Sequence, residues 1–176
     1  MAGLGPPGRG GSDGRIGRMS DTPQRAQPLP RSHFTRFQTV TTRWADNDVY
    51  GHVNNVVHYS YFDTAVNRFL IEAGVLDIHA GAVIGVVVNT QCHFFESIAF
   101  PQTVHVGLAV AQLGASSVTY ELALFADDAP LAAAVGRFVH VYVDRGTRRP
   151  VPLPEALRAA LRPLLSTPDQ EPKECE

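Results

Sequence analysis

The sequence predicts an α+β fold in which a five-stranded antiparallel sheet wraps around one long helix. One segment has apolar residues at helical spacing, and four strand-like segments follow it in close succession. The turns between the later strands are short enough to require antiparallel hairpins. With an early strand before the helix, the order becomes strand, helix and four strands, so a single helix covers the apolar face of one sheet.

The first strand is predicted over residues 33–44, which are rich in Thr, Phe and Val, the residue types that suit a half-buried strand. A helix of about 19 residues follows, because apolar residues recur at steps of three and four from Tyr59 to Ala73. Asn54 is suited to cap the start of this helix, and Gly74 is suited to close its end.

Four further strands are predicted after the helix, and turn-forming residues separate them. They cover residues 83–95, 103–113, 117–125 and 131–144, and a short helix is predicted over residues 154–165. One helix covers such a sheet incompletely, and unpaired strand edges favour self-association. We therefore expect at least a dimer, a homodimer or homotetramer joined through sheet edges and faces.

The domain organisation predicted from composition is one folded domain over residues 32–166 between two tails. Residues 1–31 are rich in Gly, Pro and Arg and contain no aromatic residue, so a disordered N-terminal tail is expected. Met19 lies within it and is a candidate translation start. Residues 167–176 are polar and are expected to form a flexible C-terminal tail.

Charge and hydropathy exclude several classes of protein. The chain of 176 residues has a formal net charge of -2, which argues against a nucleic-acid or membrane-surface binder. No apolar run is long enough for a membrane span or a signal peptide, so a cytoplasmic location is expected. Cys92 and Cys175 match no metal or disulfide spacing, and no Gly-rich phosphate loop follows a strand. We expect no cofactor.

The stretch over residues 44–63, WADNDVYGHVNNVVHYSYFD, concentrates acidic, amide and histidine side chains around the start of the predicted helix. A transition-metal site is one interpretation. His52 and His58 are six positions apart, however, unlike the histidine pair four apart that helical zinc sites use. No metal site is predicted from them.

A calcium-binding loop is a second interpretation of the same stretch. Asp46, Asp48 and Gly51 match the first, third and sixth positions of an EF-hand loop. Tyr50 occupies a position that needs an oxygen ligand, and Val57 stands where a bidentate Glu is required. The pattern therefore disfavours calcium.

Two interpretations of the stretch remain open. Asp46, Asn47 and Asn54 each suit a structural role as a turn or capping residue. Asp48 lies well before the helix, behind a Gly-His turn that would return its carboxylate to the helix N-terminus. Free N–H groups and the positive end of the helix dipole stabilise a developing oxyanion, and a nearby carboxylate attacks or activates water. This arrangement suits acyl transfer.

The run Asp48-x-x-Gly51-His52-Val53-Asn54-Asn55, followed by Tyr61-Phe62-Asp63, resembles the signature of the 4-hydroxybenzoyl-CoA thioesterase branch of the hotdog-fold superfamily. The similarity spans residues 33–155. The resemblance implies a hotdog fold, an acyl-CoA substrate, and hydrolysis of its thioester bond. The motif is fairly specific for the family and much less specific for the acyl group.

The resemblance also implies roles for particular residues. Asp48 matches the catalytic carboxylate, and the backbone N–H of Asn55 matches the donor that polarises the thioester carbonyl. Asp63 matches an acidic helix position, which serves as the catalytic base in another hotdog branch or pairs with an arginine across the subunit interface. His52 and Asn54 are expected to shape the substrate-binding loop.

The sequence departs from this family at two places. His58 stands where many relatives have Tyr, either in the wall of the acyl pocket or as an equivalent hydrogen-bonding ring. The hairpin at residues 114–117 lacks the Arg or Lys that often holds the CoA phosphates. Arg148 and Arg149, in the basic group that follows the last strand, are candidates to bind these phosphates, or they form a solvated loop.

Rival functions have weaker support in the sequence. No Gly-x-Ser-x-Gly elbow indicates a serine hydrolase, and Cys92 lies within a strand without an evident electropositive setting. No histidine-acid motif of a hotdog dehydratase is apparent. The main alternative is a non-catalytic hotdog module that binds acyl-CoA as a sensor. The acyl chain, and the choice between nucleophile and general base for Asp48, stay open.

Overall fold

The computed structural model describes residues 26–166. The predicted tails lie outside this range, apart from residues 26–31, and so does the candidate start at Met19. Within residues 26–31, the Leu29 carbonyl accepts a hydrogen bond from Ala132 N–H, and Arg31 N–H donates to the Pro130 carbonyl. The chain therefore contacts the connection between β4 and β5 slightly before residue 32.

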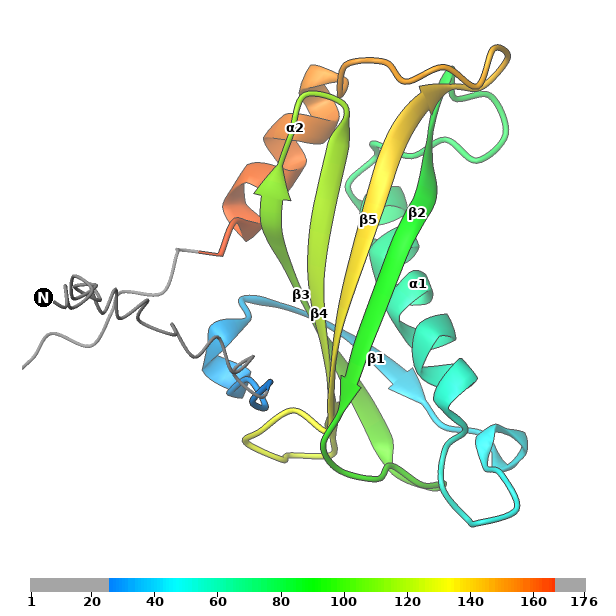
Figure 1. Ribbon diagram of the computed structural model, residues 1–176, viewed down its shortest axis with the longest axis vertical. Helices are drawn as coiled ribbons and strands as arrows, with labels where there is room; N and C mark the ends of the chain where they lie inside the picture. The colour runs from blue at the N-terminus through cyan, green and yellow to red at the C-terminus, as the bar shows by residue number, and fades with distance from the viewer. Residues whose placement is uncertain (1–25, 167–176) are drawn as a thin grey trace, which may run out of the picture.

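Five antiparallel strands form one sheet in the order β1-β3-β4-β5-β2 (Figure 1). They are β1 (Arg36–Thr41), β2 (Val83–Phe94), β3 (Thr103–Leu113), β4 (Ser117–Ala126) and β5 (Ala134–Asp144). The predicted architecture, a five-stranded antiparallel sheet around one long helix, is confirmed. β1 is shorter than the predicted strand because one-turn 3-10 helices flank it at Arg31–His33 and Trp44–Asp46.

The long helix α1 (Asn55–Glu72) lies along one face of the sheet (Figure 1). Its predicted ends are confirmed: the Asn54 side chain accepts a hydrogen bond from Val56 N–H, and Gly74 has a φ of +67° just beyond the last turn. The helix face that meets the sheet is fully buried at Phe62, Ala65 and Val66. These side chains join the main core with the helix-facing residues of β3 and β4.

The helix packs tightly on the sheet at Gly136 of β5. A Cβ atom built on Gly136 would lie 2.5 Å from Cε2 of Phe62, closer than real side chains pack. The absence of a side chain at Gly136 therefore allows the Phe62 ring to rest on the sheet backbone. This contact fixes how near α1 lies to β5.

The two edges of the sheet are β1 and β2, and β2 is much the longer. Its outer edge is apolar: Val86, Val87 and Val88 are 37%, 41% and 57% exposed. A short C-terminal helix, α2 (Glu155–Leu161), packs its Leu157 and Leu161 into the main core. Among residues 26–166, no helix combines the length and apolar character needed to span a bilayer.

Candidate active site

The loop before α1 is a small hairpin that folds back on itself. Asn54 N–H donates to the Asp46 carbonyl at 2.9 Å, Asn47 pairs with Val53, and Asp48 N–H donates to the His52 carbonyl at 2.8 Å. Gly51, with a φ of +82°, occupies the tip. Because the chain reverses here, the Gly-His turn returns residues 52–54 to the same side as Asp48.

A buried carboxylate anchors this hairpin to α1. Asp46 is 1% exposed and accepts hydrogen bonds from the Arg43 backbone and guanidinium and from the Tyr61 hydroxyl, the last at 2.7 Å. Burial raises the pKa of Asp46, but these hydrogen bonds outweigh it and leave the pKa below its ordinary value. Asp46 is therefore ionised at neutral pH and has a structural role.

The first amide of α1 is free to bind a ligand. Val56 N–H donates to Asn54 Oδ1, and Val57 N–H donates to the Asn54 carbonyl. Asn55 N–H has no acceptor within residues 26–166, and Asn55 is exposed. An uncapped amide at the positive end of an 18-residue helix is suited to hold a partial negative charge.

Five of the sequence-predicted site residues line one pocket of about 390 Å³ at this helix start, namely Asp48, His52, Asn54, Asn55 and His58. The Asp48 carboxylate is half-buried and accepts hydrogen bonds from Tyr50 N–H at 2.8 Å and His52 N–H at 3.4 Å, both through Oδ1. Its Oδ2 has no partner within the described residues. The pocket thus combines a carboxylate oxygen and a free helix amide.

His58 forms part of the buried wall of this pocket. Its ring packs edge-on against Phe94 of β2 at 5.2 Å between centroids. Burial lowers the pKa of His58 more than its hydrogen bond with the Asn54 carbonyl raises it, so the imidazole is neutral at pH 7. Since Nδ1 lies 3.1 Å from that carbonyl, Nδ1 donates and Nε2 is left as an acceptor.

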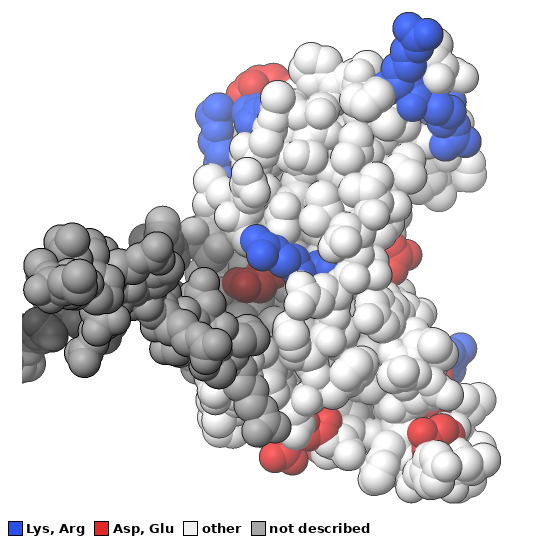
Figure 2. All heavy atoms as spheres, in the orientation of Figure 1, with Lys and Arg blue, Asp and Glu red and all other residues white. Residues whose placement is uncertain are grey.

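The other three predicted site residues lie outside the pocket. Asp63 is exposed on α1 two turns beyond Asn55, and its charge acts on His140 of β5. Arg148 and Arg149 are exposed in the turn after β5, at the end of the sheet opposite the start of α1 (Figure 1). Basic side chains gather at this end of the molecule (Figure 2).

Two polar residues of the pocket were not anticipated from the sequence. Glu96 and Ser97 line the pocket from the connection between β2 and β3. Their only sequence signal was their place after a strand, which does not distinguish a pocket wall from an ordinary loop. Within residues 26–166, no group of three or more His, Cys, Asp or Glu side chains is arranged to hold a metal ion.

The sequence and the structure were compared with known proteins. The sequence profile of the thioesterase-like superfamily matches residues 42–161. The crystal structure of the PA5185 protein of Pseudomonas aeruginosa is 54% identical, with a TM-score of 0.79 over 81% of this chain and 100% of that chain. A thioesterase of Thermus thermophilus, solved with coenzyme A and Zn, is 33% identical, with a TM-score of 0.64 over 77% of this chain and 98% of that chain.

More distant proteins share the fold or part of the sequence. The 1,4-dihydroxy-2-naphthoyl-CoA thioesterase Slr0204 of Synechocystis is 19% identical, with a TM-score of 0.67 over 73% of this chain and 96% of that chain, a likeness of fold alone. YsmA of Bacillus subtilis is 22% identical over 89 residues, 51% of this chain. The chain spans 60% of the length of this curated relative.

Proposed function

Because this chain belongs to the thioesterase-like superfamily, we propose that it hydrolyses the thioester bond of an acyl-CoA to a free acid and CoA. The observation that carries the proposal is that the Asp48 carboxylate and the free Asn55 amide open into one pocket. The motif around Asp48 supports the finer assignment to the 4-hydroxybenzoyl-CoA thioesterase branch.

In this proposal, the Asn55 N–H binds the thioester carbonyl oxygen. The charge that develops on this oxygen is then stabilised by the amide and by the positive end of α1. One such donor is worth about 3 to 4 kcal/mol of transition-state stabilisation. Asn54 caps the helix and His52 ends the hairpin, so both hold the amide and Asp48 in place.

Asp48 acts on the carbonyl carbon by one of two routes. Its carboxylate adds to the carbon and expels the CoA thiolate, giving an anhydride that water then cleaves, or it removes a proton from the attacking water. Oδ2 has no partner within the described residues, so it is the oxygen available for either route. His58, neutral and in the wall, accepts a hydrogen bond from substrate or water.

A second subunit completes the site in this proposal. Antiparallel pairing of two copies along the full length of β2 would bury Val86, Val87 and Val88. It would place residues 83–85 of one copy beside residues 92–94 of the other. Arg148 and Arg149 of one copy would then approach the partner's pocket, where they are suited to bind CoA phosphates. Asp63 would face the same interface.

The decisive experiment measures release of free CoA thiol from short, long and aromatic acyl-CoAs. A sensor, the alternative function, would bind these esters without releasing thiol. Asp48→Asn should lower kcat by at least about a hundredfold with an unchanged melting temperature, since the carboxylate is removed and its shape kept.

Asp128→Asn, in the exposed turn between β4 and β5, is the matched control and should retain full activity. Undiminished hydrolysis by Asp48→Asn would assign the chemistry to another residue.

A further inference from the structure

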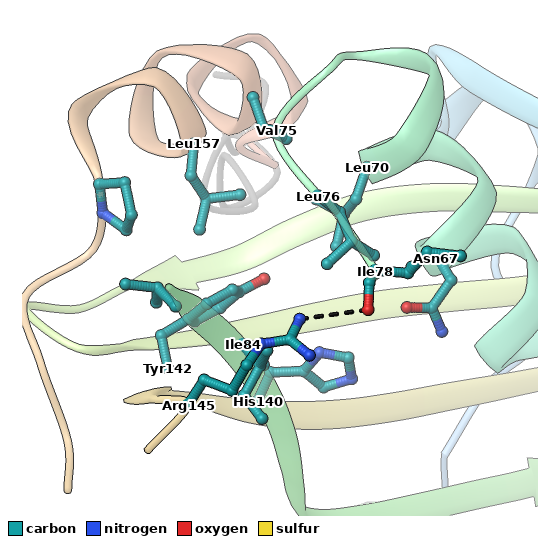
Figure 3. A pocket seen from close by; sticks show the side chains of 13 residues that line it. Asn67, Leu70, Val75, Leu76, Ile78, Ile84, His140, Tyr142, Arg145 and Leu157 are labelled. Atoms are coloured by element: carbon teal, nitrogen blue, oxygen red, sulfur yellow. Dashed lines mark hydrogen bonds between the residues drawn. The ribbon is translucent and has the colours of Figure 1, made fainter. Parts of the chain in front are cut away.

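A second cavity, of about 240 Å³, lies at the other end of α1 from the candidate active site. The second half of α1, the start of β2, the end of β5 and α2 surround it (Figure 3). Its apolar wall is formed by Leu70, Val75, Leu76, Ile84 and Leu157. Walls of this kind accept a hydrocarbon chain or ring.

One residue that lines this cavity has a buried polar atom without a partner. His140 of β5 is 3% exposed, and its Nε2 has no hydrogen bond within the described residues. Burial lowers the pKa of His140 more than the charge of Asp63 raises it, so the imidazole is neutral at pH 7. A buried nitrogen without a partner costs free energy, and a ligand that supplies one would recover it.

Two further polar side chains converge on the same side of the cavity. Asn67 of α1 and Arg145, just after β5, point toward His140 (Figure 3). The Arg145 guanidinium donates to the carbonyls of Gly81, Asp77 and Ile78, which fixes the loop over the cavity. The cavity therefore has an apolar wall on one side and a polar corner on the other.

In the proposed dimer, this cavity would lie next to the catalytic pocket of the partner. Its β2 residues are Val83, Ile84 and Gly85, whereas Phe94, at the opposite end of β2, lines the candidate active site. Antiparallel pairing across β2 would bring these two ends together, one from each subunit. An acyl group whose carbonyl lies at the partner's Asn55 would then extend into this cavity.

We propose that this cavity selects acyl groups that carry a hydroxyl on an otherwise apolar frame, with His140 as the specificity-determining residue. The inference rests on the proposed thioesterase function and adds the class of acyl group. A hydroxyl both donates and accepts, so it satisfies Nε2 of His140 in either neutral tautomer. An unsubstituted acyl chain would leave Nε2 without a partner.

The test compares kcat/KM for octanoyl-CoA, 3-hydroxyoctanoyl-CoA and 8-hydroxyoctanoyl-CoA. The wild-type protein should prefer at least one hydroxylated ester by about tenfold, the usual effect of pairing a buried polar group. The preferred position of the hydroxyl indicates how far His140 lies from the thioester carbonyl of the bound substrate. Equal kcat/KM values for all three esters in the wild-type protein would overturn the proposal without any variant.

His140→Phe should abolish this preference and retain turnover of octanoyl-CoA, because a phenyl ring keeps the edge contact with Tyr120 and removes both nitrogens. His105→Phe, on β3 and outside the cavity, is the matched control and should keep the preference. A preference that survives His140→Phe would exclude His140 as its cause.

Direct binding measurements test the acyl selectivity of the cavity independently of the proposed thioesterase activity. Free 8-hydroxyoctanoate, 3-hydroxyoctanoate and octanoate are titrated while the imidazole nitrogen signals of His140 are followed by NMR. A shift of the Nε2 signal with a hydroxy acid but not with octanoate, together with no thiol release from any ester, would retain the cavity assignment and overturn the thioesterase. Thiol release without any shift would retain the thioesterase function and overturn the cavity assignment.

Discussion

Asp46 and Asp48 are two positions apart, yet their carboxylates have different surroundings. Asp46 is buried against Arg43 and Tyr61, whereas Asp48 opens into the pocket. The sequence predicted this division, because Asp46 suited a turn and Asp48 matched a family motif. It could not predict the hydrogen bond from Tyr61, since a contact between residues fifteen positions apart depends on how the hairpin folds against α1.

Tyr61→Phe tests this anchor. Removing the hydroxyl leaves the buried Asp46 carboxylate with one donor fewer, so the free energy of unfolding should fall by about 1 to 3 kcal/mol. Urea denaturation at pH 7 measures the change. Tyr59→Phe, on the same helix, is the control, because the Tyr59 hydroxyl makes no hydrogen bond within the described residues. Equal unfolding free energies for the two variants would show that Tyr61 is not an anchor.

At the scale of elements, α1 and the strands β2, β3 and β4 end within one residue of their predicted positions, whereas both ends of β1 and the start of β5 differ by three residues. Helix ends have local signals, and both Asn54 and Gly74 act as their residue types indicate. Strand ends depend on pairing. β5 begins at Ala134, later than the predicted residue 131, because Leu131 and Ala132 pair with the N-terminal segment at residues 29–30.

Asn54→Ala tests whether the helix cap also sets the position of the Asn55 amide that we propose to be catalytic. Loss of the hydrogen bond to Val56 N–H should cost about 1 kcal/mol of stability and should lower kcat, because the first turn, which carries the Asn55 N–H, is released. Thermal melts and thiol release measure the two effects. Asn54→Ser retains a capping oxygen and should recover most of both. A stability loss with an unchanged kcat would separate the cap from catalysis.

Val88→Lys tests the β2 edge as the subunit interface. Val88 lies near the middle of β2, so two introduced lysines would lie close together at the two-fold axis and repel. Analytical ultracentrifugation should show a shift from dimer to monomer, with loss of thiol release. Leu165→Lys, which changes a similarly exposed residue away from β2, should remain dimeric. A dimeric Val88→Lys protein would show that the subunit interface does not lie at the β2 edge.

At the scale of the whole molecule, the candidate residues fall into two groups at opposite ends of the sheet. Asp48 and Asn55 lie at one end, and Arg148 and Arg149 lie at the other (Figure 1). Both groups were identified from the sequence, but their separation was not. The residues around 148–149 do not indicate at which end of the sheet β5 finishes. Only a second copy brings the two groups together in the proposed arrangement.

Subunit mixing tests this arrangement. Asp48→Asn and a double Arg148→Ala, Arg149→Ala variant, each weakly active at low acyl-CoA concentration, are unfolded and refolded together. Random pairing makes half of the dimers mixed, with one subunit of each variant. Each mixed dimer has one intact site if the arginines act across the interface. Activity should recover to about a quarter of wild type. If the arginines serve their own subunit, no mixed dimer contains an intact site and activity will not recover.

The contact between Gly136 and Phe62 affects the width of the candidate active-site pocket, although neither residue lines it. A methyl group at position 136 would push against the Phe62 ring and lift α1 from the sheet. Because α1 is a continuous rod and Tyr61 ties the Asp46 hairpin to it, the first amide and Asp48 would move together, away from Phe94 and Glu96 in the opposite wall of the pocket. A residue near the start of β5, without any contact to substrate, therefore affects the gap in which a carbonyl must fit.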